Sequence, residues 1–189
     1  MNTLLKRALD SAAVWHREHL RKYPGVSVPY VSHVAGVAAI LSRHGFDDDV
    51  VAAGALHDAM EDAGVTEAEL ARLFGPRVAV LVRHVSEEDK SLGWEERKRA
   101  YLEKFPKKPW EAQAITLADK IDNFASIVVC SELYGDPWAM FKRGKPAQLE
   151  RFEALATMAG ALPAHALVDE FLTAFDRVRE VPEGPRSHK

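Results

Sequence analysis

The chain has 189 residues, of which 47% are hydrophobic and 28% are charged, a composition typical of a single folded, soluble domain rather than a disordered chain. The net charge of −3 argues against a general nucleic-acid-binding protein, because such proteins gain affinity by neutralising phosphates. The single cysteine, Cys130, excludes an intramolecular disulfide and a paired-cysteine metal or redox site.

Apolar residues recur at intervals of three and four, which is the period of an amphipathic α-helix. Pro29 and Pro76 suit the first position of a helix, and the side chains of Asp47 and Thr66 can cap free backbone N–H groups. In chain order, we expect helices over residues 4–22, 29–45, 48–63, 66–75, 76–85, 94–105, 109–133, 145–160 and 164–180.

No alternating run is long enough to predict a strand, so the expected fold is an all-α, single-domain helical bundle. Residues 1–180 form this domain, and residues 181–189 are expected to be a disordered tail. The first 22 residues contain no apolar stretch typical of a secretory signal, and no segment has the composition of a membrane span. We therefore expect a cytoplasmic protein.

A group of ionisable residues follows the apolar half of the third predicted helix. His57, Asp58, Glu61 and Asp62 lie within one arc of a helix that turns by about 100° per residue. Burying such charges without partners costs roughly several kcal/mol each, and a divalent cation would compensate for this cost. A solvated last turn of the helix is the alternative, and the group by itself does not separate the two interpretations.

Polar residues on two other helices favour the metal interpretation. His33 lies among valines, where a lone histidine is more often a hydrogen-bonded core residue than a ligand. Asp119 and Asn123 share one face of the long helix over 109–133, where Asp119 could equally be a structural ion pair. Together, two imidazoles and two carboxylates suit a divalent transition ion such as Mn or Fe. Four protein ligands leave coordination positions open for water and substrate, which is typical of a catalytic site.

The sequence around these residues resembles the HD superfamily of metal-dependent phosphohydrolases. The resemblance is closest to the hydrolase domain of RelA/SpoT proteins and to the stand-alone small alarmone hydrolases. It spans residues 17–127 and is carried by the stretches RKYPGVSVPYVSHVAGVA, AAGALHDAMEDAGVTEAELARLFGPRVAVLVRHVSEEDK and LADKIDN. The HDxxED block at residues 57–62 is specific to that group. The resemblance implies an HD-type bundle and a hydrolase without the synthetase and regulatory domains of longer members.

The resemblance also implies a role for each site residue. The residues implied to hold a Mn²⁺ ion are His33, His57, Asp58 and Asp119. Orientation and deprotonation of the attacking water are implied for Glu61 and Asp62. Contact with the nucleotide is implied for Arg21, Lys22, Lys90 and Asn123. The implied reaction is hydrolysis of the 3′-pyrophosphate of guanosine tetra- or pentaphosphate (ppGpp or pppGpp), which gives GDP or GTP and pyrophosphate.

The chain departs from the family pattern at several positions. Trp94 stands where a lysine is common, and Asp122 stands where a tyrosine or histidine usually precedes the asparagine. The helical angle from Asp119 predicts that Asp122 lies at the rim of the site rather than among the metal ligands, and a salt bridge on the surface is the alternative. The family's late arginine–tyrosine pair has no clean match, although basic residues lie near its place, at Lys142, Arg143, Lys145 and Arg151.

These departures leave alternatives for the substrate and for the class of function. The substrate could be another nucleotide, such as an adenine alarmone, a deoxynucleoside monophosphate or NADPH. A non-catalytic module that senses a nucleotide would not need Glu61 and Asp62, and a purely structural helical protein would not need ionisable residues at core-like positions. We expect a small-molecule nucleotide as the partner, and neither nucleic acid nor a membrane.

Overall fold

The computed structural model describes residues 2–86 and 93–184. Within these ranges the chain forms helices and no strands, which confirms the all-α prediction, and two isolated β-bridges occur in the loop before the second helix. The helices and 3₁₀ turns are α1 (Thr3–Trp15), α2 (Val31–Arg43), α3 (Asp48–Leu56), α4 (Ala59–Asp62), α5 (Glu67–Phe74), α6 (Pro76–Val85), α7 (Trp94–Lys104), η1 (Phe105–Lys107), α8 (Trp110–Leu133), η2 (Pro137–Met140), α9 (Gly144–Gly160) and α10 (Ala166–Glu180).

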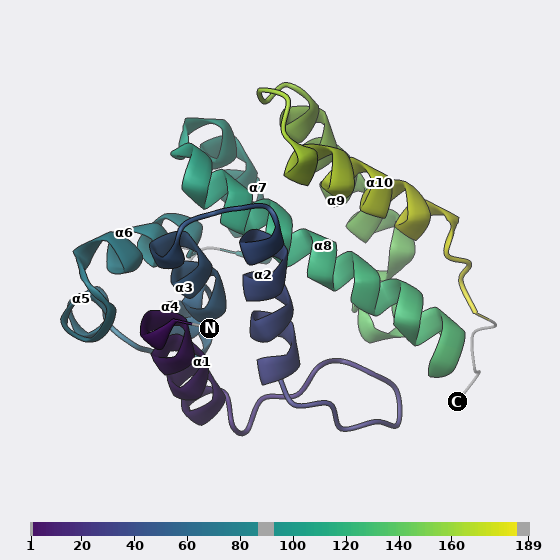
Figure 1. The fold of residues 1–189 in the computed structure, drawn as a ribbon. Helices are drawn as coiled ribbons and strands as arrows, with labels where there is room; N and C mark the ends of the chain where they lie inside the picture. The colour runs from purple at the N-terminus through teal and green to yellow at the C-terminus, as the bar shows by residue number, and fades with distance from the viewer. Residues whose placement is uncertain (1, 87–92, 185–189) are drawn as a thin grey trace.

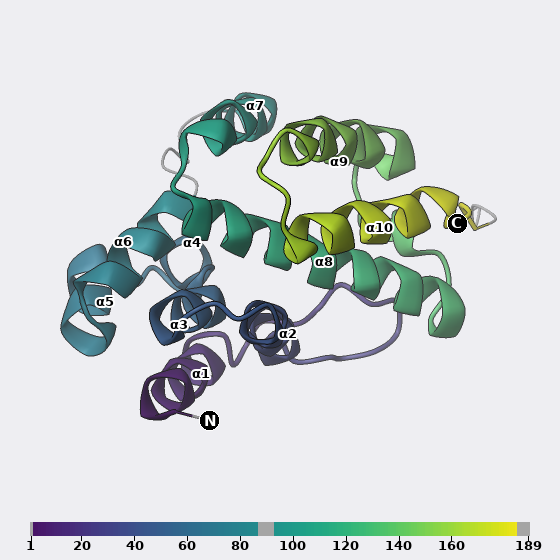
Figure 2. The same cartoon turned by 45° about the horizontal axis from the view of Figure 1, so that its top comes forward.

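Helix α8 is the central element of the bundle. Helices α2, α3 and α6 pack against it from the N-terminal part of the chain, and α10 packs along it from the C-terminal part (Figure 1). The view turned by 45° shows α9 and α10 together on one side of α8, and α1 to α6 on the other (Figure 2). Helix α8 therefore lies between the two groups of helices, and its side chains reach both of them.

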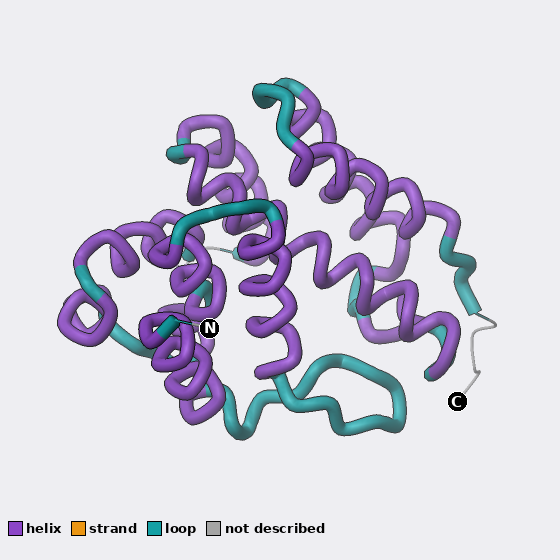
Figure 3. The backbone as a smooth tube through the Cα atoms, viewed as in Figure 1, coloured by secondary structure: helices purple, strands orange, loops and turns teal. Residues whose placement is uncertain are grey.

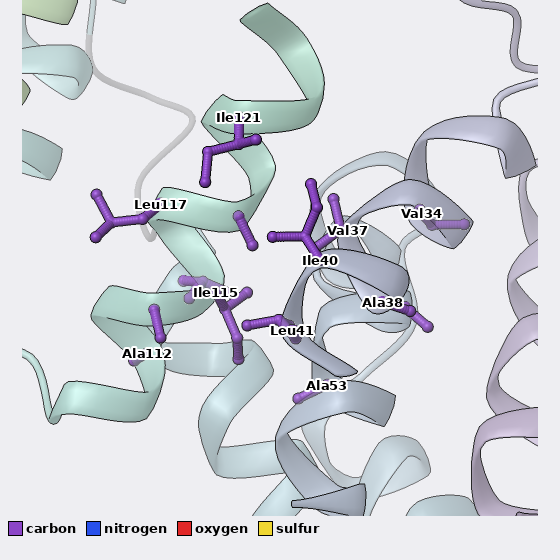
Figure 4. Close-up of a cluster of buried hydrophobic side chains, with 14 of the residues drawn as sticks. Val34, Val37, Ala38, Ile40, Leu41, Ala53, Ala112, Ile115, Leu117 and Ile121 are labelled. Atoms are coloured by element: carbon purple, nitrogen blue, oxygen red, sulfur yellow. The ribbon is translucent and has the colours of Figure 1, made fainter. Parts of the chain in front are cut away.

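The hydrophobic core lies where α2 crosses α8. Val34, Val37 and Leu41 are fully buried on α2, and Ile115 and Leu117 are fully buried on α8. The close-up shows Ile40 and Leu41 of α2 pointing toward Ile115 of α8, with Ala53 of α3 beside them (Figure 4). The helical period that predicted the elements thus also provides the packed surfaces that join them.

Several predicted helix boundaries are confirmed by the caps. The side chain of Asp47 accepts a hydrogen bond from the backbone N–H of Val50, 3.1 Å away, and begins α3. Thr66 accepts one from the N–H of Glu69 at 3.2 Å and begins α5. Pro76 opens α6 as expected.

The first predicted helix is wrong at its end, because α1 stops at Trp15 rather than near residue 22. Residues 16–30 form a long loop that runs toward the far end of α8 (Figure 3). Backbone hydrogen bonds between its two arms join Arg21 to Val28 and Tyr30 to His19. These hydrogen bonds across the loop outweigh the local helical preference of the segment.

The helix predicted over residues 48–63 is also wrong as a continuous element. It breaks at His57 and Asp58, where Asp58 adopts φ −94° and ψ 0°, and α4 follows as a short separate turn. This bridge region of backbone space is sparsely populated and is common at active sites.

The end of the chain is packed further than residue 180. Val181, placed in the tail by the sequence, is buried, and its carbonyl oxygen accepts hydrogen bonds from the Trp138 indole and from the Lys145 ammonium group. The rest of the expected tail, residues 185–189, lies outside the described residues, so its disorder stays a prediction. Among the helices described, none combines the length and apolar character needed to cross a bilayer.

Replacing Gly54 by alanine should destabilise the protein by about 1–3 kcal/mol, because overpacking a buried contact forces its neighbours to shift. A Cβ atom there would lie 2.3 Å from Cδ1 of Leu41 and 3.3 Å from Cγ1 of Val37. Gly160 is the matched control, since a Cβ placed there would meet no described atom within 4 Å beyond its own chain neighbours and the adjacent backbone of its helix. Urea unfolding followed by circular dichroism measures both variants, and equal stabilities would contradict the close approach of α2 and α3.

Candidate active site

Three elements bring the predicted metal ligands together. His33 lies near the start of α2, His57 and Asp58 lie at the break between α3 and α4, and Asp119 lies in the middle of α8. Because α2 and α3 both pack against α8, the crossing of these helices brings residues that are far apart in sequence to one point. The α3–α4 break occurs at this point.

The ligand atoms of the four residues converge closely. Nε2 of His57 lies 3.0 Å from Oδ2 of Asp58, and Nε2 of His33 lies 3.9 Å from the same oxygen. Oδ1 of Asp119 lies 3.3 Å from Nε2 of His33 and 3.9 Å from Nε2 of His57. Both imidazoles are buried, and the two carboxylates are mostly buried. The two imidazoles therefore present the same nitrogen, Nε2, to the carboxylate oxygens.

The other ring nitrogen of each histidine has a separate partner. Nδ1 of His57 lies 2.8 Å from the carbonyl oxygen of Gly54, and Nδ1 of His33 lies 2.6 Å from Oδ2 of Asp122. Both acceptors require Nδ1 to carry the proton, which leaves the lone pair on Nε2 when the rings are neutral. The prediction that Asp122 lies at the rim is wrong, because its carboxylate lies directly behind His33.

Charges in the cluster shift its protonation equilibria. Burial opposes ionisation of both carboxyl groups, but the histidines hold the pKa of Asp58 below its ordinary value, and Lys120 holds that of Asp119 well below its own. Burial also opposes charge on His57, yet the Asp58 and Asp119 carboxylates raise the pKa of His57 to about 9. Without a metal ion, the cluster therefore holds anionic aspartates beside a protonated His57.

This donor set fits a divalent metal ion. His33, His57 and Asp58 each offer one ligand atom, and these atoms lie within 4.8 Å of one another. Two imidazole nitrogens fixed by outer hydrogen bonds and two ionised carboxylates are the chemistry of a transition-metal site. In the absence of a metal ion, the proton on His57 contributes positive charge beside the two negative carboxylates. A bound metal cation would take the place of this proton.

A cavity of about 430 Å³ opens beside the ligand cluster. Its size is within the range of small-molecule sites. The metal-ligand candidates Asp58 and Asp119 form part of its wall. The charged and polar residues that line the rest are Arg21, Lys22, Glu61, Lys120, Asn123, Ser126, Gln148 and Arg151, and the aromatic ones are Tyr23, Tyr30, Tyr101, Phe141 and Phe152. Cationic and aromatic groups in one cavity match a ligand that has both phosphates and a base.

A hydrogen-bonded chain joins the cavity wall to the ligand cluster. The side-chain amide of Asn123 donates to Oδ1 of Asp119 at 2.5 Å. Nη2 of Arg21 donates to Oδ1 of Asn123 at 3.0 Å and to Oγ of Ser126 at 2.7 Å. On the other side, the hydroxyl of Tyr30 donates to Oδ2 of Asp58 at 2.5 Å. Side chains of the cavity wall and the candidate metal ligands are thus parts of one network.

The structure gathers most of the residues that the sequence singled out. Arg21, Lys22, Glu61 and Asn123 line the cavity beside Asp58 and Asp119, and His33 and His57 lie buried next to them. Asp62 is exposed and is not one of the described residues that line the cavity. Lys90 and the side chain of Trp94 lie outside the described part of the chain.

Sequence reasoning missed the aromatic residues of the cavity wall and, among the polar contacts of the site, Tyr30, Lys120 and Gln148. Tyr30 donates to Asp58, Lys120 pairs with Oδ2 of Asp119 at 2.5 Å, and Gln148 lines the far wall of the cavity. Lys120 had a usable signal, since it directly follows Asp119 in an otherwise apolar stretch. Gln148 had no such signal, because a polar residue in a helix of mixed composition is expected on the surface.

Comparison with known proteins agrees with this geometry. The model of the HD domain matches residues 8–133, which include all four candidate ligands. The chain belongs to the HD-domain family.

The similarity to individual HD-domain proteins extends over most of the chain. Two relatives are named guanosine-3′,5′-bis(diphosphate) 3′-pyrophosphohydrolase MESH1. The one from Drosophila melanogaster is 43% identical over 64% of this chain and 68% of its own length. The one from Homo sapiens is 39% identical over 67% and 71%. A solved structure described as a metazoan ortholog of SpoT that hydrolyses ppGpp is 32% identical, with a TM-score of 0.81 over 96% of this chain and 98% of its own.

Metal binding should strengthen with pH, because a metal ion must displace the proton from His57. The pKa of His57 is raised from 6.5 to about 9, so the competing proton is held throughout the neutral range and is lost only as the pH passes about 9. The apparent affinity for Mn²⁺ should rise by roughly tenfold per pH unit between pH 6.5 and 8.5.

Isothermal titration calorimetry in buffers of different ionisation enthalpy measures both the affinity and the protons released. The Asp58→Ala variant is the control for binding elsewhere on the protein. An affinity that does not change between pH 6.5 and 8.5 would contradict a protonated His57 in the metal-free state.

Proposed function

We propose that this protein is a metal-dependent hydrolase that removes the 3′-pyrophosphate from guanosine tetra- or pentaphosphate, with GDP or GTP and pyrophosphate as products. The observation that carries the proposal is a four-residue ligand cluster that opens onto a cavity lined by cationic and aromatic side chains. Relatives named for this activity, at 38–43% identity, support the choice of substrate.

The metal proposed for the cluster is Mn²⁺, held by His33, His57, Asp58 and Asp119. A set of two imidazoles and two carboxylates accepts Mn²⁺, whereas the described cluster offers no thiolate, the ligand that softer ions prefer. When bound, a divalent cation supplies Lewis-acid chemistry, which polarises a phosphoryl oxygen and lowers the pKa of water. Water activation and substrate binding are assigned to the side chains around the metal site.

Activation of water is assigned to the two acidic residues of α4. Glu61 lines the cavity together with Asp58, next to the space where a substrate phosphate would bind. There it would orient a water molecule and accept its proton as the water attacks phosphorus. Asp62 is the adjacent carboxylate, and we include it in this role because both residues belong to the HDxxED block.

The bond that breaks joins the ribose 3′ oxygen to phosphorus, because the proposed products are a free 3′ hydroxyl and intact pyrophosphate. Oxygen from water forms the new bond to phosphorus, and the 3′ oxygen takes up a proton as it leaves. The proton removed by Glu61 is available for that transfer. Negative charge that develops on the phosphoryl oxygens would be stabilised by the cations of the cavity wall.

Substrate binding is assigned to the cations and the amide that line the cavity. Arg21 and Lys120 are bonded to the groups around Asp119, Lys22 lines the same cavity, and Arg151 extends the positive charge to α9. Asn123 would contact the nucleotide while it holds Asp119. The aromatic rings of Tyr23 and Phe141 offer stacking surfaces for a base. The assignment of Lys90 and the cytoplasmic location both stay predictions from the sequence.

A nucleotide panel tests the proposed function. Metal-loaded protein is incubated separately with ppGpp, an adenine 3′-pyrophosphate nucleotide, a deoxynucleoside monophosphate and NADPH, and the products are separated. Pyrophosphate and GDP from ppGpp are the expected result. Faster orthophosphate release from a monophosphate or NADPH would identify a different phosphohydrolase, and binding of ppGpp without turnover would identify a sensing module.

The Glu61→Gln variant should lose turnover while it keeps the metal ion and the substrate. The amide preserves the shape of the side chain but cannot accept a proton, so we expect kcat to fall by about 10²–10⁴-fold. KM should stay within about threefold, since the side chain acts on water rather than on the nucleotide.

Glu153→Gln, an exposed position on α9, is the matched control and should behave as wild type. Steady-state kinetics with ppGpp and metal analysis of the purified protein measure these quantities. A Glu61→Gln variant with more than about a tenth of the wild-type kcat would exclude Glu61 as the general base.

A further inference from the structure

Asp122 occupies a position behind the ligand cluster that neither the sequence pattern nor the proposed reaction explains. Its Oδ2 lies 2.6 Å from Nδ1 of His33, on the side of the ring opposite to the other ligands. The His33 side chain is only 1% exposed, so the carboxylate is the partner that fixes this ring in the interior. The opposite ring nitrogen, Nε2, lies 3.3 Å from Asp119.

We propose that Asp122 is a positioning residue of the metal site, which acts by holding His33. Its carboxylate accepts the Nδ1 proton, which fixes the tautomer that leaves Nε2 unprotonated and sets the orientation of the ring. A carboxylate in this place also makes the imidazole a stronger ligand. The inference rests on the proposed metal site but not on which nucleotide is the substrate.

The neighbouring helix carries a residue that makes room for this contact. Gly36 lies one turn after His33 in the interior of α2, where glycine is less favourable than alanine by about 0.5–1 kcal/mol. A Cβ atom at Gly36 would lie 2.0 Å from Oδ1 and 2.9 Å from Cγ of Asp122. Any larger residue would displace the carboxylate, so Gly36 and Asp122 act as a pair.

Asp122 also connects His33 to the cavity. Its Oδ2 lies 3.7 Å from Nη2 of Arg21, and its backbone carbonyl accepts a hydrogen bond from Oγ of Ser126 at 2.9 Å. Arg21 in turn donates to Asn123, the residue that holds Asp119. The arginine therefore lies between the partners of two ligand candidates, His33 and Asp119.

A simple ion pair between Asp122 and Arg21 is the competing interpretation. Their separation of 3.7 Å is long for a direct hydrogen bond, whereas the contact with His33 is short. An ion pair alone would contribute to stability or to nucleotide binding and would leave metal affinity unchanged. Metal affinity in the absence of nucleotide therefore separates the two roles.

The test is calorimetric titration of the full-length variants with Mn²⁺. Loss of an outer partner of a metal-bound histidine typically costs about 10–100-fold in metal affinity, and we expect this loss for Asp122→Ala. Asp122→Asn should lose less, because the amide oxygen can still accept the Nδ1 proton. Glu132→Gln, an exposed position on the same helix, is the matched control and should bind Mn²⁺ as wild type does.

A double-mutant cycle tests the pairing with Gly36. Gly36→Ala should weaken Mn²⁺ binding in the wild-type background but should have little further effect in the Asp122→Ala background, since the displaced group is then absent. Equal effects of Gly36→Ala in both backgrounds would overturn the pairing. Circular dichroism confirms that each variant is folded before titration.

A second measurement follows the ring itself. In the Zn²⁺-loaded protein, which is diamagnetic, the Nδ1 proton of His33 should give a hydrogen-bonded NMR resonance that shifts upfield in Asp122→Asn. If Asp122→Ala and Asp122→Asn both bind Mn²⁺ with wild-type affinity, the inference is overturned and the proposed hydrolase still stands. If the wild-type protein binds no Mn²⁺, both the inference and the proposed metal site fail.

Discussion

The structure depends on charge compensation at one buried point. Two ionised aspartates lie against two buried histidines where α2, α3 and α8 meet, and such charges are stable in an interior only when they are paired. In the metal-free state, a proton on His57 and the ammonium group of Lys120 provide the pairing. A bound cation would provide the same compensation together with chemistry, which is why one cluster can serve both the fold and the reaction.

Helix α8 contributes residues both to the hydrophobic core and to the candidate active site. One part of its surface, with Ile115, is packed in the core against α2. The following turns carry Asp119, Asp122 and Asn123 toward the ligand cluster and the cavity. Because the core fixes the angle and register at which α2 crosses α8, it also fixes the distance between His33 and its partners. The apolar packing and the polar network are therefore not independent.

The wall of the cavity is built from two parts of the chain, of which only the first is matched by the HD-domain model. The region matched by the HD-domain model, residues 8–133, provides the ligand cluster and the wall around Arg21. The opposite wall comes from later residues, including Phe141, Gln148 and Arg151. The candidate metal ligands thus lie entirely on the matched segment, whereas the wall of the cavity is shared between that segment and the later residues.

The sequence by itself determined the helical fold, most helix boundaries and the four candidate ligands. Helical period and caps are local properties, and ionisable residues within apolar helices stand out without knowledge of the fold. Tertiary structure alone decided the loop over residues 16–30, the break at Asp58 and the place of Asp122. Each of these depends on which helix faces meet. The helical angle placed Asp122 relative to Asp119, but only the crossing of α2 over α8, with space left at Gly36, put its carboxylate against His33.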